Sequence, residues 1–175
     1  MDPATRAWRG LDEASLTRRG RALGAVLRAG DVVLLDGPMG AGKTTMVRAI
    51  ALGLGVIRPE RVQSPTFTLC MIHRGPVTLV HVDLFRLGAE DDEAIGAGVG
   101  LDAVGLDDLL AESELGGGAS VLVVEWGKRW RSAPADRLEI TLAPAGPERR
   151  DLVTSARGPR STLLLAAWAE AAACS

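Results

Sequence analysis

Apolar residues gather in this chain into short continuous runs that are separated by glycine, proline and charged residues. Residues 32–36 and 120–125 are runs of this kind, and each ends in an acidic residue. Short apolar runs without alternation are typical of strands that are covered on both faces. Residues 66–72 and 77–83 are two further strand candidates, and the Arg74-Gly75-Pro76 sequence between them predicts a hairpin turn.

Three other segments have the spacing of helices. Residues 12–28 carry leucine, alanine and valine at mixed helical spacing, and residues 43–54 form a second candidate that Gly55 closes. A third helix is expected over residues 161–173, with a cap near Ser161. Together with the strand candidates, these helices predict an α/β protein.

The regions between these elements are less regular. Residues 88–115 are acidic, rich in glycine and partly helical, with Leu106, Leu109 and Leu110 as the expected buried positions. Residues 137–143 alternate between apolar and polar side chains, which predicts a late strand at an edge of the sheet.

The last part of the chain is expected to form a tail. Residues 144–160 are polar and rich in glycine and proline, as is typical of a linker. We therefore expect one α/β domain over residues 1–144, followed by a linker and a C-terminal helical tail over residues 145–175.

Composition narrows the possible functions only slightly. With 175 residues, 47% of them hydrophobic, the chain can bury one sizeable core. A net charge of -2 and an isoelectric point near 5.7 give no bulk reason to bind nucleic acid, although a local basic patch remains possible.

The cysteines and the lack of a long apolar run bear on where the protein is found. Cys70 and Cys174 have no metal-ligand spacing and suit a reducing compartment. Because no apolar run approaches the roughly 18 residues of a membrane span, and the N-terminal region lacks the apolar part of a signal peptide, we expect a cytoplasmic protein with no membrane partner.

A phosphate-binding motif stands between the first strand and the second helix. Residues 37–44 read Gly-Pro-Met-Gly-Ala-Gly-Lys-Thr, which satisfies the whole loop pattern. Glycines let backbone N–H groups converge on phosphate oxygens, and the helix presents its positive end to the anion. We expect Lys43 to reach the β- and γ-phosphates and the Thr44 hydroxyl to ligate Mg²⁺. The predicted nucleotide-binding residues of this segment are Gly37, Met39, Gly40, Ala41, Gly42, Lys43, Thr44 and Thr45.

Two acidic residues at strand ends are the expected partners of this loop. Asp83 follows one strand candidate and Glu125 ends another. Because the carboxyl ends of strands in an open α/β sheet face the ligand crevice, both are predicted to be catalytic residues and ligands of Mg²⁺, with the division of roles left open. Thr66 is either a candidate switch hydroxyl that approaches the metal or a threonine of the turn that follows Pro65. His81 alternates with Asp83 and either lines the same cleft or is structural, while Trp126 packs over the base or ribose or belongs to the core.

The base is expected to be adenine. Guanine-specific loops of this class read the base with an Asn-Lys-x-Asp segment, and this chain contains no asparagine. We therefore expect ATP or ADP as the nucleotide, held by apolar packing and backbone contacts.

Four ordered blocks of the chain resemble the TsaE family, also called YjeE. Family members look like G-D-L-G-A-G-K-T, S-P-T-F-T-L, H-x-D-L-Y-R-L and I-E-W. The corresponding blocks here are residues 37–44, 64–69, 81–87 and 124–126, so the resemblance covers about residues 12–142. Two departures stand out: Pro38-Met39 replaces the usual Asp-Leu, and Phe85 replaces the usual tyrosine.

The resemblance implies a fold, an activity and partners. The fold would be the three-layer P-loop NTPase fold, with a mixed, largely parallel central sheet flanked by helices. The activity would be Mg²⁺-dependent ATP hydrolysis, weak without partners, which sustains turnover of the TsaB and TsaD proteins as they make N6-threonylcarbamoyladenosine on tRNA. Contact with tRNA would be indirect. Asp83, Glu125 and Trp126 would be the sensitive downstream positions, and Thr17 matches a threonine near the nucleotide.

Two other functions remain open at this stage. A P-loop small-molecule kinase would share the loop, and residues 128–131, Lys-Arg-Trp-Arg, offer cations for a lid, although such a run is more often a solvated turn. A nucleotide-gated binding module would use the acidic segment 90–114 or the C-terminal helix to dock a partner.

Overall fold

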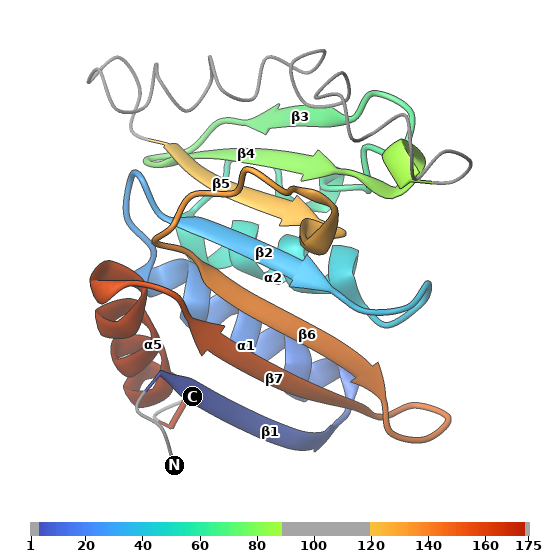
Figure 1. Cartoon of the computed structure of the whole chain (residues 1–175), viewed down its shortest axis with the longest axis vertical. Helices are drawn as coiled ribbons and strands as arrows, with labels where there is room; N and C mark the ends of the chain where they lie inside the picture. Colours follow the sequence, from blue (N-terminus) through green and yellow to red (C-terminus); the bar gives the residue numbers. More distant parts are fainter. Residues whose placement is uncertain (1–3, 89–119, 174–175) are drawn as a thin grey trace.

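The computed structural model describes residues 4–88 and 120–173, which form one mixed sheet with helices packed on it (Figure 1). Across the sheet the strands follow the order β1-β7-β6-β2-β5-β4-β3. Strand β2 pairs in parallel with β5 and β6, and β4 pairs in parallel with β5. The bounds of the strands are β1 (Thr5–Leu11), β2 (Val32–Asp36), β3 (Cys70–His73), β4 (Thr78–Asp83), β5 (Ser120–Glu125), β6 (Leu138–Pro144) and β7 (Arg150–Ala156). The predicted α/β class with a mixed sheet is confirmed, and its central strands are parallel.

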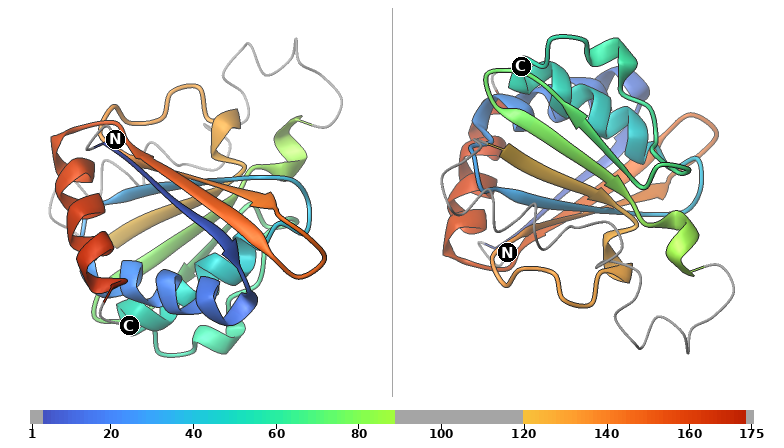
Figure 2. Two further views of the ribbon diagram at one scale, coloured as in Figure 1. Left: turned by 90° about the horizontal axis from the view of Figure 1, so that it is seen from below. Right: turned by 90° about the horizontal axis from the view of Figure 1, so that it is seen from above.

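Three long helices, α1 (Glu13–Val26), α2 (Lys43–Leu54) and α5 (Pro159–Ala171), lie on the same face of the sheet (Figure 2). The Asp12 side chain caps α1 by accepting a hydrogen bond from the backbone N–H of Ser15. Helix α2 ends at Gly55, which adopts a φ of 75°. Short 3₁₀ turns are η1 (Pro59–Arg61), η2 (Phe85–Gly88) and η4 (Gly127–Arg129).

Side chains of the central strands alternate between two apolar clusters. In β2, Val33 and Leu35 face the helices and join the larger cluster, whereas Val32 and Leu34 point to the opposite face. There a smaller cluster forms with β4 and β5 and is covered by Trp130. Burial on both faces explains why β2 and β5 are continuous apolar runs in the sequence.

The sequence prediction is wrong at the C-terminal side of the sheet. Residues 150–156 form strand β7, which pairs with both β1 and β6, where a linker was expected over 144–160. Strand β6 is consequently an inner strand, although its alternation predicted an edge. The described part of the predicted tail therefore shares the sheet and core of the preceding residues.

Other element boundaries also shift. Strand β1 is absent from the sequence prediction, and β3 begins at Cys70, because residues 66–69 turn toward the end of β4. Helix α5 begins at Pro159, and Ser161 caps it from the third helical position by accepting a hydrogen bond from the N–H of Gly158. The segment 88–115, with Leu106, Leu109 and Leu110, lies almost entirely outside the described residues. Among the helices that the structure describes, none is both long and apolar enough to cross a membrane.

A tryptophan pair fixes α5 to the rest of the fold. Trp168 of α5 is completely buried, and its ring centroid lies 4.7 Å from that of Trp8 in β1. Its indole N–H donates to the backbone carbonyl oxygen of Arg19 in α1, 2.9 Å away. One side chain thus connects the first strand, the first helix and the last helix.

We predict that the Trp168→Ala substitution lowers the free energy of unfolding by about 3–5 kcal/mol, because it removes a fully buried ring and leaves a cavity. The measurement is urea unfolding followed by circular dichroism. Leu163→Ala on the exposed side of the same helix is the control, since Leu163 is 73% exposed and its loss should change stability by less than about 0.5 kcal/mol. Equal, small effects of both substitutions would contradict the role given to Trp168.

Candidate functional site

The loop between β2 and α2 has a backbone that only glycine can follow at two points. Gly37 has a φ of 139°, and a Cβ atom there would lie 2.2 Å from the carbonyl oxygen of Leu142 in β6. Gly42 has a φ of 100° and precedes α2 without giving its first turn a side-chain cap. The N–H groups at the start of α2 therefore remain available to an anion.

Lys43 folds back onto its own loop. Its ammonium group donates to the carbonyl oxygens of Gly37, at 2.8 Å, and Pro38, at 2.9 Å, and lies 3.8 Å from the centroid of the Trp126 ring. Burial lowers the pKa of Lys43 below its ordinary value, while the nearby carboxylates of Glu125 and Asp83 act in the opposite direction. The cation is thus held by dipoles and an aromatic face close to two acidic groups.

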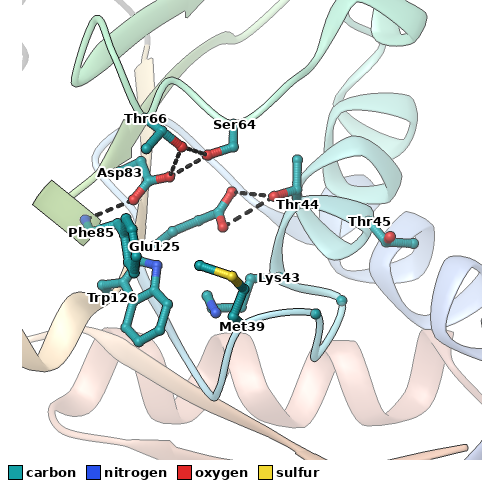
Figure 3. Close-up of a pocket in the computed structure, with 12 residues that line it drawn as sticks. Met39, Lys43, Thr44, Thr45, Ser64, Thr66, Asp83, Phe85, Glu125 and Trp126 are labelled. Atoms are coloured by element: carbon teal, nitrogen blue, oxygen red, sulfur yellow. Dashed lines mark hydrogen bonds between the residues drawn. The ribbon is translucent and has the colours of Figure 1, made fainter. Parts of the chain in front are cut away.

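Glu125 ends β5 with a buried carboxylate that faces the first turn of α2 (Figure 3). The Thr44 hydroxyl donates to it, with distances of 2.9 Å to Oε1 and 3.2 Å to Oε2. His81 of β4 places Nε2 2.9 Å from the same Oε1 atom. A buried carboxylate of this kind requires such partners, since an unpaired charge in the interior is costly.

Asp83 gathers a second group of hydroxyls at the end of β4. Its Oδ2 atom accepts hydrogen bonds from Ser64 and from Thr66, the latter at 3.1 Å, and these two hydroxyls lie 2.7 Å apart. Its Oδ1 atom accepts the backbone N–H of Phe85 at 2.8 Å. Asp83 therefore holds the loop after η1 against the end of β4, beside Glu125, its register partner in β5.

Trp126 adopts a left-handed backbone with a φ of 60°, which turns its ring toward the loop. The ring packs against Phe85, with centroids 5.2 Å apart, and against the guanidinium of Arg129, 4.9 Å from the centroid. The next residue, Gly127, lies so close to β2 that a Cβ would come within 2.5 Å of the Leu34 Cβ. This close approach fixes the turn that presents the indole.

These side chains surround a cavity of about 360 Å³. Most of the residues predicted from the sequence meet there, from the loop, α2, β4 and β5. Gly37 and Ala41 support the loop without lining the cavity, and Thr17 lies in α1 and does not line the cavity either. The lining residues are Met39, Gly40, Gly42, Lys43, Thr44, Thr45, Ser64, Thr66, Asp83, Phe85, Glu125 and Trp126.

Two residues of this site, Ser64 and Phe85, line the cavity but were not among the predicted site residues. His81, for which the sequence left a place in the cleft and a structural role open, contacts Glu125 from the interior. The sequence offered a signal for Ser64, because its hydroxyl lies two residues before Thr66 in an extended Ser-Pro-Thr segment. For His81, alternation with Asp83 indicated the correct face of the strand but not the partner.

The oxygen atoms of the site suit a hard cation such as Mg²⁺. Thr44 and Glu125 bring a hydroxyl and a carboxylate together, and Asp83 is the register partner of Glu125 on the neighbouring strand. Within the described residues, no cluster of three or more His, Cys, Asp or Glu side chains forms a complete metal site. A cation here would take its remaining ligands from phosphate and water.

The parts assembled above define the class of protein. The chain has the P-loop NTPase fold. The features that define it are a buried parallel strand, a glycine loop with its lysine, an open helix N-terminus and acidic residues at neighbouring strand ends. The model of the family described as "Threonylcarbamoyl adenosine biosynthesis protein TsaE" matches residues 11–152. The chain belongs to the TsaE family, as the four sequence blocks predicted.

Individual relatives agree with this assignment. The tRNA threonylcarbamoyladenosine biosynthesis protein TsaE of Treponema pallidum is 36% identical over 140 residues, covering 79% of this chain and 91% of that protein. The protein of the same name from Streptomyces coelicolor is 40% identical over 139 residues, covering 77% and 82%. The crystal structure of Bacillus subtilis YdiB has a TM-score of 0.69 to this chain at 26% identity and covers 95% of each. The predicted fold is confirmed.

We predict that Asp36, the last residue of β2, opposes folding at neutral pH. Burial raises the pKa of Asp36 above the ordinary 3.8, although the N–H of Lys128 and the charge of Lys43 lower it in part. A carboxyl group with a raised folded-state pKa stabilises the fold only while protonated, so this stability is lost as pH rises above 3.8. Asp36→Asn should therefore increase the free energy of unfolding at pH 7, and this gain should shrink toward pH 4.

The control for Asp36 is Asp151, whose pKa shifts in the opposite direction. The N–H of Gly10 and the guanidinium of Arg9 lower the pKa of Asp151, so its contribution is present at neutral pH and lost on acidification. Asp151→Asn should destabilise the protein at pH 7. Urea unfolding of both variants between pH 4 and pH 7 gives the comparison, and a change of the same sign in both would refute the assignment for Asp36.

Proposed function

We propose that this protein binds ATP with Mg²⁺ and hydrolyses it to ADP and phosphate as a cytoplasmic accessory protein of tRNA threonylcarbamoyladenosine biosynthesis. The observation that carries the proposal is the contact between Thr44, directly after the phosphate-loop lysine, and the buried Glu125 carboxylate opposite. The pathway is proposed from the names of the family and of the relatives. The ligand, a nucleotide, is proposed from the phosphate-binding loop.

In this proposal each group of the site has one task. The loop N–H groups and Lys43 bind the phosphates, which requires the Lys43 ammonium to leave the carbonyls of Gly37 and Pro38. Thr44 and Glu125 hold the metal, and Mg²⁺ when bound neutralises charge on the phosphate oxygens. Asp83 holds the loop of Ser64 and Thr66 at the cavity, and its carboxylate would orient the attacking water.

Partner proteins are expected to raise the rate. Phosphoryl transfer needs positive charge near the transferred group, and an arginine often supplies it. Among the described residues that line the cavity none is an arginine. Arg129, which packs on the ring of Trp126, donates to the carbonyl oxygens of Leu84 and Phe85. We therefore propose slow hydrolysis by the isolated chain and faster turnover with TsaB and TsaD.

The kinase alternative gains less support from this geometry. A lid would need mobile cations in the 128–131 run, but Arg129 is tied to two carbonyls and Trp130 is buried in the smaller cluster.

An experiment can distinguish a nucleotide-gated binding module from the proposed ATPase. If a non-hydrolysable ATP analogue supports many rounds of tRNA modification, binding alone is the function.

We predict that ATP turnover by the full chain rises when TsaB and TsaD are added, and that Lys43→Ala abolishes it in both conditions. Removing a charged hydrogen-bond donor from the phosphates should also weaken ATP binding at least about tenfold, because such bonds contribute about 1.5–3 kcal/mol. Release of phosphate and calorimetric titration with ATP are the two measurements.

Lys128→Ala is the matched control, since it removes the exposed second lysine of the chain, which does not line the cavity. It should leave both binding and turnover near the original values. Turnover that persists in Lys43→Ala, or the appearance of a phosphorylated metabolite without free phosphate, would exclude the proposed ATPase.

A further inference from the structure

We infer that His81 is a positioning residue, which holds the Glu125 carboxylate in place for the reaction. This role rests on the proposed ATPase function. His81 lies in β4 and is completely buried, so it cannot contact the nucleotide. It acts through the carboxylate that faces Thr44.

The register of the sheet explains how the histidine reaches this carboxylate. Asp83 pairs with Glu125 across the parallel β4 and β5 strands, and His81 is two residues before Asp83 on the same face of its strand. The imidazole therefore approaches Glu125 diagonally from the inner side, while Thr44 approaches from α2. Two donors from different elements hold one carboxylate.

The hydrogen-bond partners of the ring indicate a task beyond filling space. His81 Nε2 lies 2.9 Å from Glu125 Oε1, but Nδ1 is buried and has no partner among the described residues. Glu125 is consequently the polar contact that orients this ring. A nearby buried histidine, His73 of β3, has its ring centroid 6.2 Å away and no contact with Glu125, which makes it a structural counterpart.

Because of the contact with His81, the two carboxylate oxygens of Glu125 have different numbers of hydrogen-bond donors. Oε1 accepts both His81 Nε2 and the shorter contact from Thr44, whereas the described residues give Oε2 only the contact at 3.2 Å. The histidine thus occupies the inner oxygen and leaves Oε2 with capacity for another ligand. Loss of the imidazole N–H would leave Oε1 with one donor fewer and free the carboxylate to rotate.

The kinetic test compares three variants of the full chain assayed with TsaB and TsaD. His81→Leu should lower kcat about 10-fold and leave the KM for ATP within about twofold, because groups that orient a metal ligand typically contribute 10- to 100-fold. His81→Gln keeps an N–H donor near the position of Nε2 and should recover most of kcat. His73→Leu is the matched control for burial of a leucine in place of a histidine, and should retain kcat.

A loss in His73→Leu as large as that in His81→Leu, or no recovery in His81→Gln, would show that the histidine only supports folding. Urea unfolding of all three variants checks that they are folded at the assay temperature. The recovery in His81→Gln matters because a general loss of structure would also lower the apparent kcat at an unchanged KM, but glutamine would not reverse it.

A second measurement is independent of hydrolysis. The chain has two histidines, so nitrogen-15 imidazole spectra of the free protein contain two sets of signals, which His73→Leu assigns. The Nε2–H signal of His81 should move in Glu125→Gln while the His73 signals stay in place. If the His81 signals do not move, the inference is overturned even when the enzyme is active. If they move as expected but the wild-type chain does not hydrolyse ATP, only the proposed function is contradicted.

Discussion

The buried carboxylate of Glu125 is the constraint on which the site depends. A charged group at the end of a fully covered strand is stable only with donors around it, and the fold provides them from β4 and α2. Parallel pairing of β5 with β4 and β2 brings strand ends to one edge, where the glycine loop begins. The sheet geometry therefore brings Thr44, Asp83 and Glu125 together at this edge.

Much of this arrangement follows from short patterns in the sequence. Continuous apolar runs correctly predicted β2 and β5, because strands covered on both faces need no polar side chains. The loop motif and the acidic residues at strand ends predicted the pairing of Asp83 and Glu125 beside Lys43, since parallel strands end at a common edge. These features depend on local sequence or on a general rule of sheet topology.

The elements that the sequence did not reveal depend on contacts between distant segments. Strand β7 contains arginine, aspartate, threonine and serine, and it resembles a linker until β1 and β6 pair with it on both sides. Thr154 in that strand is almost completely buried, which no local pattern indicates. The partner of His81 was equally hidden, because alternation gives the face of a strand but not the neighbour 44 residues away.

The position of Lys43 has a thermodynamic consequence for ligand release. Its ammonium already has two carbonyl partners and an aromatic face, so an arriving phosphate replaces existing contacts and gains only the difference between them. When the phosphate leaves, the Lys43 ammonium can again donate to the carbonyl oxygens of Gly37 and Pro38. For the nucleotide binding proposed above, these contacts of Lys43 reduce the net free energy of binding, which favours release of the ligand over tight retention.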